Sequence, residues 1–232
     1  MDTNLNTNKI SKTPLSLLFL IIGFIYVSCL ITSNIISAKM ISVLGITLPA
    51  AVVLFPITYI IGDVMTEVYG YRKARIIIWS GFGCNLFAVL VFLLAIILPY
   101  PSFWTNQEAF ATVLGTTPRI LLASLTGYLF GEFSNSIVLS RLKVVTNGKR
   151  LWVRTIVSTI IGELLDSVIF ITIAFAGTMD FKELLLMILF QYLFKVLYEI
   201  LCTPLTYFVI RKVKKHENID TYDVGVSYNP VR

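Results

Sequence analysis

The stretch WVRTIVSTIIGELLDSVIFITIAFAG, residues 152–177, decides how this chain folds. It is apolar over a length that, as an α-helix, crosses the ~30 Å hydrocarbon core of a bilayer. Two acids, Glu163 and Asp166, nevertheless lie within it. A carboxylate at the centre of a membrane helix costs about 2.5–3.5 kcal/mol on insertion scales. These acids therefore indicate a polar task at membrane depth.

Five other stretches share this apolar character, and together they predict a single membrane domain over residues 1–232. The chain is 56% hydrophobic and 14% charged, whereas soluble domains carry about 25% charged residues. The expected fold class is all-α, because the runs lack the period-two alternation of membrane barrel strands. The expected helices are 15–37, 49–69, 76–98, 118–140, 152–177 and 183–210, with tails at 1–14 and 211–232.

The basic residues predict the orientation of the chain. Of the 19 Lys and Arg residues, only Lys39, Arg119 and Lys182 fall in the connections of one side, and Lys195 lies within a span. The positive-inside rule then predicts that both termini lie in the cytoplasm, at the inner membrane. The charge is a topology signal with affinity for anionic lipid. A nucleic-acid partner is not expected.

Four of the expected helices carry polar side chains at helical spacing, which places them on one face of each helix. Such faces should turn toward one another or toward water, because lipid offers them no partner. The acids outnumber the single base, Lys195, and are Asp63, Glu67, Glu132, Glu163, Asp166 and Glu199. The excess carboxylates must be protonated, solvated or matched to donors on a ligand.

Several explanations suit such a polar lining. Internal ion pairs, of Lys195 with Glu199 one turn along the same helix or with Asp166 across two helices, would be purely structural. An intramembrane aspartyl protease would need a Gly-x-Gly-Asp motif, and Gly62-Asp63 lacks the first glycine. An assembly protein would bind a partner helix through the polar stripes, and Gly127-x-x-x-Gly131 favours close helix packing. A transporter would use the polar groups to hold a small polar solute.

The segment FPITYIIGDVMTEVYGYR, residues 55–72, resembles the signature of the queuosine-precursor transporters. So do SNIISAK at 33–39, GEFSNS at 131–136, RTIVSTIIGELLDS at 154–167 and the tail at 220–230. The resemblance implies six helices, arranged similarly to the substrate-binding subunits of energy-coupling-factor transporters. It also implies uptake of 7-cyano-7-deazaguanine, its 7-aminomethyl relative or queuine, which feed the queuosine modification of tRNA.

The polar residues suit that substrate by their own chemistry. A guanine-like edge offers two adjacent N–H donors, which one carboxylate accepts together. We expect Glu163 or Asp166 to clamp this edge, with Lys195 and Gln191 nearby. Asp63 and Glu132, deeper toward the cytoplasm, are expected to bind ligand, relay protons or brace an inner gate. The full set of candidate substrate-binding residues is Asn34, Asp63, Glu132, Glu163, Asp166, Gln191, Lys195 and Glu199.

The remaining expectations are mostly negative. The chain is predicted not to be an enzyme, with no catalytic residue, metal or cofactor, and it contains no Walker motif for ATP hydrolysis. A homodimer, separate coupling subunits and a proton gradient all remain open. The second candidate function is a carrier, or the binding subunit of one, for another small, flat, vitamin-like solute.

Overall fold

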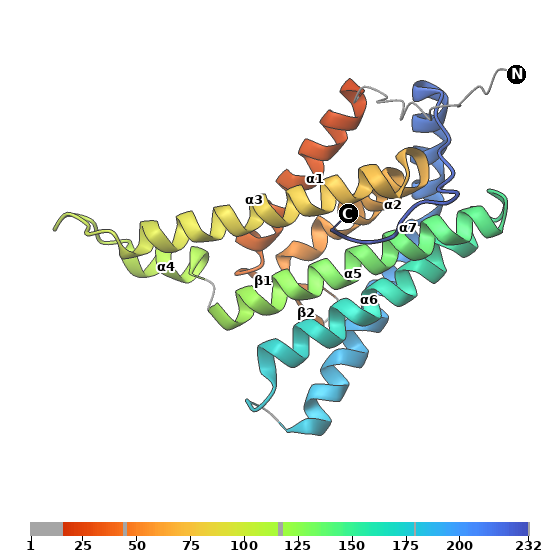
Figure 1. Ribbon diagram of the computed structural model, residues 1–232. Helices are drawn as coiled ribbons and strands as arrows, with labels where there is room; N and C mark the ends of the chain where they lie inside the picture. Colours follow the sequence, from red (N-terminus) through yellow and green to blue (C-terminus); the bar gives the residue numbers. More distant parts are fainter. Residues whose placement is uncertain (1–15, 44–45, 116–117, 179, 232) are drawn as a thin grey trace, which may run out of the picture.

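The structure is a computed structural model that describes residues 16–43, 46–115, 118–178 and 180–231. Within these residues the chain forms seven α-helices, one short 3-10 helix and a two-stranded sheet (Figure 1). The elements are α1 (Leu17–Ile36), β1 (Met40–Val43), β2 (Ile46–Pro49), η1 (Ala50–Val53), α2 (Phe55–Tyr69), α3 (Tyr71–Ile97), α4 (Gln107–Leu114), α5 (Pro118–Val145), α6 (Leu151–Phe175) and α7 (Phe181–Glu217).

Helix length and composition confirm an all-helical, polytopic membrane protein. Five stretches are long and apolar enough to cross a membrane, and they contain α1, α3, α5, α6 and α7. The longest, α7, continues to Glu217 instead of ending at 210. Its 37 residues span about 55 Å at 1.5 Å per residue, so α7 extends well past the ~30 Å hydrocarbon core. Its last turns therefore form part of the cytoplasmic end of the protein on the predicted orientation.

The segment 49–69 differs from the single long helix expected there. The antiparallel hairpin β1–β2 ends at Pro49, η1 follows, and α2 begins only at Phe55. Pro56 lies in the first turn of α2, where its missing N–H leaves no helical bond unmade. The 15 residues of α2 span about 22 Å, which is less than the hydrocarbon core. Because of Pro49 and Pro56, α2 is shorter than the helix that apolar composition alone predicted.

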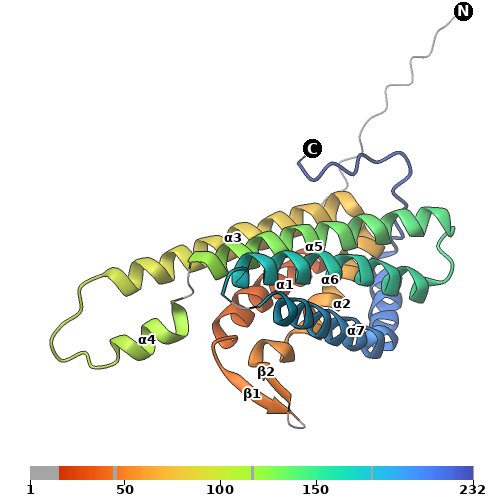
Figure 2. The ribbon, with the colours of Figure 1, turned by 90° about the horizontal axis from the view of Figure 1, so that it is seen from below.

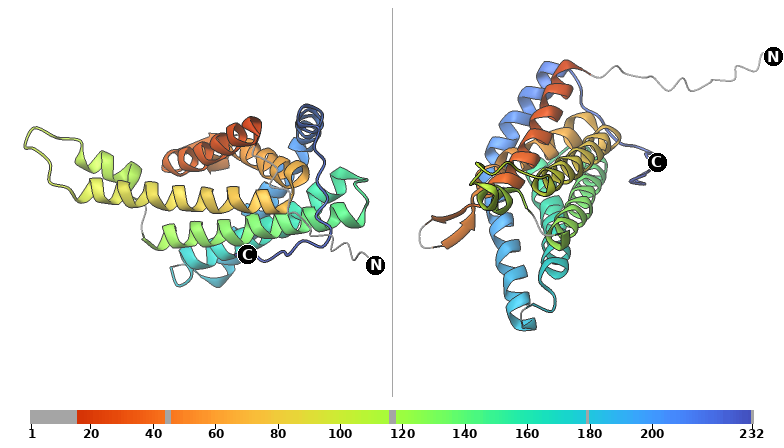
Figure 3. Two further views of the ribbon diagram at one scale, coloured as in Figure 1. Left: turned by 45° about the horizontal axis from the view of Figure 1, so that its top comes forward. Right: turned by 90° about the vertical axis from the view of Figure 1, so that its left-hand side faces the viewer.

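The helices bring four polar faces together. Helices α5 and α6 lie side by side along most of their length (Figures 1 and 2). Helix α7 packs against both α6 and α2, and α2 also packs against α5. An apolar core lies beside this group, mostly on α1, α2 and α3 with a few residues of α6 and α7, and it includes Phe19, Tyr26, Val64, Met65 and Ile77. Figure 3 shows α4 and its loop at the far end of α3, away from α7.

Glycines allow α5 and α6 to approach closely. A Cβ atom added to Gly131 would lie 2.9 Å from the Cβ of Asp166 and 3.2 Å from the carbonyl oxygen of Gly162. A Cβ added to Gly162 would lie 2.9 Å from the carbonyl oxygen of Gly131. The expected close packing at Gly127-x-x-x-Gly131 is confirmed, because a Cβ on Gly127 would lie 2.8 Å from Oδ1 of Asp166.

The variant Gly131→Ala is expected to destabilise the protein by about 1–3 kcal/mol, the usual cost of overpacking. The added methyl group meets backbone on α6, which cannot rotate away as a flexible side chain can. Thermal unfolding in detergent measures the effect. Gly83→Ala in α3 is the matched control, because a Cβ there meets no atom within 4 Å. Equal melting temperatures for the two variants would contradict this close helix contact.

Candidate functional site

The centre of the polar interior is an ion triad, which we define as Glu163, Asp166 and Lys195. The Lys195 ammonium group of α7 lies 2.8 Å from Oε2 of Glu163 on α6 and also pairs with Oδ2 of Asp166. Glu163 and Asp166 are three residues apart on one face of α6, so a single cation reaches both. Of the two structural pairings considered for Lys195, the structure shows the one with Asp166 across helices, and Glu163 joins it. Among the described residues Lys195 forms no ion pair with Glu199.

The triad retains access to its surroundings. The side chains of Lys195, Glu163 and Asp166 are 10%, 14% and 21% exposed, respectively. Tyr59 of α2 hydrogen-bonds to Glu163, so a phenol ring borders the charged groups. Each carboxylate has about four acceptor positions, and Lys195 occupies only some of them. Donors on a ligand can therefore still be accepted.

Glu132 of α5 lies next to the triad. It interacts electrostatically with Glu163, Asp166 and Lys195, and it lines one cavity together with Tyr26 of α1. Tyr26 in turn donates to the Tyr128 hydroxyl at 3.4 Å. Gly62 borders the same small cavity. Glu132 thus links the triad to α1 and to the interior of the bundle.

Asp63 and Glu199 form a second acidic pair, which lies deeper in the protein. Each is only 1% exposed, on α2 and α7 respectively, and the two carboxylates interact electrostatically. Asp63 accepts one long hydrogen bond, from Nδ2 of Asn135 at 3.4 Å. The other oxygen of Asp63 and both oxygens of Glu199 have no hydrogen-bond partner among the described residues.

Two candidate residues lie outside these groups. Asn34 of α1 donates to Oδ1 of Asn85 on α3 at 2.6 Å, so its polar contact among the described residues is with α3. Gln191 is half-buried one turn before Lys195 on α7, and no described residue hydrogen-bonds to it. The structure thus brings together six of the eight candidates, the triad with Glu132, Asp63 and Glu199, while Gln191 borders them.

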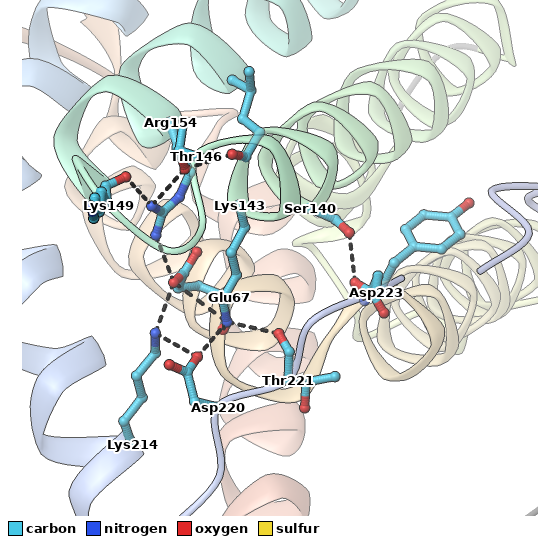
Figure 4. Close-up of polar contacts among 12 residues, drawn as sticks. Glu67, Ser140, Lys143, Thr146, Lys149, Arg154, Lys214, Asp220, Thr221 and Asp223 are labelled. Atoms are coloured by element: carbon cyan, nitrogen blue, oxygen red, sulfur yellow. Dashed lines mark hydrogen bonds and ion pairs between the residues drawn. The ribbon is translucent and has the colours of Figure 1, made fainter. Parts of the chain in front are cut away.

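A separate ionic lock closes the end of the bundle where α2, α5, α6 and α7 converge (Figure 4). The fully buried Glu67 carboxylate of α2 lies 2.8 Å from Nη2 of Arg154, 2.8 Å from Nζ of Lys214 and 3.5 Å from Nζ of Lys143. Asp220 bridges Lys143 and Lys214 as well. We call Glu67, Lys143, Arg154, Lys214 and Asp220 the ionic lock.

The chain after α7, residues 218–231, runs along this end of the bundle, and we call it the strap. Asp223 accepts hydrogen bonds from the Tyr71 amide at 2.8 Å and from the Ser140 hydroxyl at 2.6 Å. Farther along the strap, the Trp79 indole donates to the carbonyl of Pro230 at 2.8 Å. Gly70, with φ of 85°, lies directly under the strap, and a Cβ there would lie 2.7 Å from Thr221. Helices α2, α3 and α5 are therefore tied together by the C-terminal segment.

Electrostatics stabilise the contact between strap and lock. Partial burial acts to raise the pKa of the Asp220 carboxyl, but hydrogen bonds from Lys143 and Lys214 outweigh it, so the pKa lies below its ordinary value. Asp220 is therefore held in its charged form beside the two ammonium groups.

From the sequence, the basic residues Lys143, Arg154 and Lys214 of the ionic lock were interpreted only as predictors of membrane topology. Only their tertiary contacts show that they converge on Glu67. Asn85, the partner of Asn34, was not among the predicted site residues either, although an amide in an apolar stretch itself indicates a polar contact. Among the described residues, no three His, Cys, Asp or Glu side chains are placed to hold a metal ion.

Apolar helices packed around a shared group of acids, amides, phenols and one lysine define a polytopic membrane protein with a polar interior, as a solute transporter requires. The chain belongs to the family described as "Putative vitamin uptake transporter", whose model matches residues 49–209. It is 27% identical over 201 residues to the "Probable queuosine precursor transporter" of Bacillus subtilis (strain 168), covering 86% of each chain.

A second relative is the "Queuosine precursor transporter" of Escherichia coli (strain K12), which is 28% identical over 172 residues. That match covers 73% of this chain and 75% of the relative. No solved structure matches this chain.

Proposed function

We propose that this protein takes up queuosine precursors, the 7-deazaguanines, across the cytoplasmic membrane. The observation that carries the proposal is the ion triad, in which acceptors and a strong donor lie side by side at membrane depth. Two relatives named as queuosine precursor transporters support the substrate class. Six crossings, with α2 and its preceding hairpin as the second and both termini cytoplasmic, suit the distribution of basic residues.

The triad suits a guanine-like edge in particular. The ring N–H and the exocyclic amine are adjacent donors, and Asp166 or Glu163 accepts both through charge-assisted hydrogen bonds. Lys195 or the nearby Gln191 donates to the ring carbonyl. Tyr59 offers an aromatic face beside the triad, and stacking of a base on such a face is worth about 1–3 kcal/mol. Glu132 supplies a further acid for an aminomethyl cation.

Asp166→Asn tests this assignment. Hydrogen bonds to charged groups contribute about 1.5–3 kcal/mol, so uptake should fall about 10- to 100-fold. Uptake of labelled deazaguanines is measured in cells that lack their own synthesis and salvage, at matched protein level in the membrane. Asp180→Asn is the control, since Asp180 is exposed at the start of α7. Wild-type uptake by Asp166→Asn would refute the clamp.

A carrier for another flat, vitamin-like solute is the second candidate, and the family description favours it. Guanine and a panel of vitamins added as competitors separate the two functions in the same assay. Competition by unlabelled deazaguanine alone supports the first. Uptake that a vitamin suppresses and deazaguanine does not would establish the second.

A further inference from the structure

The Asp63–Glu199 pair has no role in the substrate clamp, and it combines deep burial with missing partners. Three of its four carboxyl oxygens lack a hydrogen-bond partner among the described residues. The fourth accepts only the 3.4 Å contact from Asn135. An ionised carboxylate in such surroundings is strongly unfavourable, because no donor or cation among the described residues compensates its charge. A positive charge or a bound proton is therefore needed to compensate the charge of the Asp63–Glu199 pair.

Among the described residues, no lysine or arginine forms an ion pair with Asp63 or Glu199. Lys195, one turn from Glu199 on α7, is already shared between Glu163 and Asp166. The titratable groups that interact electrostatically with the pair are acids, a phenol and a thiol. The neighbours of Asp63 are Glu67 from α2 and Glu132 from α5. The neighbours of Glu199 are Glu163 from α6, Tyr59 from α2 and Cys202 from α7. The two carboxylates are buried on α2 and α7, which pack against each other, and three of their oxygens have no donor among the described residues. This arrangement favours a shared proton, as in dyads of buried acids.

The position of the pair connects the two ends of the site. Asp63 lies one turn from Tyr59, which contacts the triad, and one turn from Glu67 of the ionic lock. Glu199 lies one turn beyond Lys195 on α7. Any shift of α2 against α7 changes the separation of the two carboxylates. The electrostatic repulsion between the two carboxylates, and hence their affinity for a proton, then depends on whether the ion pairs of the ionic lock are formed.

From this geometry we infer that Asp63 and Glu199 form the proton-binding site that couples substrate uptake to the proton gradient. This inference rests on the proposed function. The pair binds one proton from the outside while the lock is closed. When α2 and α7 separate toward the cytoplasm, water reaches both carboxylates and the proton leaves inward. One proton enters and one proton leaves, and no other bond is made or broken.

The proton itself is tested without any substrate. Infrared difference spectra of the purified full chain in lipid, recorded between neutral and alkaline pH, report the C=O stretch of protonated carboxyl groups. Because the pair titrates as a unit, both Glu199→Gln and Asp63→Asn should remove or shift a wild-type band. The exposed Glu183→Gln leaves the spectrum unchanged. An unaltered band in both pair variants overturns the inference.

The coupling is tested in proteoliposomes with labelled 7-cyano-7-deazaguanine. For one proton per neutral substrate, an inward gradient of one pH unit should raise accumulation about tenfold. In Glu199→Gln the ratio of uptake with and without the gradient should fall to one. A wild-type protein that ignores the proton gradient, or that responds to sodium alone, overturns the coupling. Absence of any deazaguanine uptake refutes the proposed function instead, and the infrared result still decides the proton site.

Discussion

Lys195→Met is expected to abolish uptake and to destabilise the protein. The change leaves Glu163 and Asp166 facing each other without their shared cation. Removing one partner of a buried ion pair typically costs about 3–5 kcal/mol, and here two acids lose their partner at once. The proposed donor to the ring carbonyl disappears as well. Uptake in cells and thermal unfolding in detergent measure the two consequences separately.

Two further variants show which consequence belongs to which cause. Lys182→Met removes an exposed lysine from the same helix and should behave as wild type. The triple variant that combines Lys195→Met with Glu163→Gln and Asp166→Asn removes the uncompensated charges. It should recover much of the stability and remain inactive. Full uptake by Lys195→Met would show that the triad has no part in transport.

Glu67→Gln is expected to cause a large loss of stability. Glu67 is the one acid that contacts Lys143, Arg154 and Lys214 together, and its side chain is fully buried. The amide leaves three cations converging on a neutral group, with only Asp220 to compensate two of them. We expect a loss of about 3–5 kcal/mol, and more protein lost during membrane insertion. Thermal unfolding of the purified protein measures it.

The control for this prediction is Glu108→Gln, because Glu108 is exposed on α4. Glu67→Asp keeps the charge but shortens the side chain, so it should lie between wild type and Glu67→Gln. If Glu67→Gln melts with wild-type stability, the ionic lock contributes nothing to folding. This end of the bundle would then be held by strap contacts such as those of Asp223 and Trp79.

The apolar stretches predicted the long helices well. Residues 76–98, 118–140 and 152–177 correspond to α3, α5 and α6, because in lipid an apolar run must satisfy its backbone within one helix. Helix α3 begins at Tyr71 and α5 continues to Val145, in each case five residues beyond the predicted bound. The second span was less accurate. Hydropathy does not distinguish a short helix from a hairpin and a 3-10 turn, so the division at Pro49 and Pro56 was missed.

The predictions of functional residues were also only partly accurate. Helical spacing placed Glu163 and Asp166 on one face of their helix, and the pairing of Asp166 with Lys195 was among the alternatives, whereas that of Glu163 was not. Spacing could not say that Glu67 collects three cations from α5, α6 and α7, since each of those cations had a sufficient explanation as a topology signal. It also could not separate Asn34 from the acids, because Asn34 and Asn85 lie 51 residues apart and meet only when α1 packs on α3.

The sequence by itself determined that the chain is a helical membrane protein with more buried acid than base, and which faces of its helices are polar. These properties follow from the local cost of placing backbone and charge in lipid. Only the tertiary structure decided which acid meets which cation, because that depends on how far each helix rises and rotates against its neighbours. Glycine contacts between α5 and α6 and the crossing of α7 set those positions. They leave Glu163 and Asp166 sharing Lys195, Glu67 paired with three cations, and Asp63 and Glu199 buried without an ion-pair partner among the described residues.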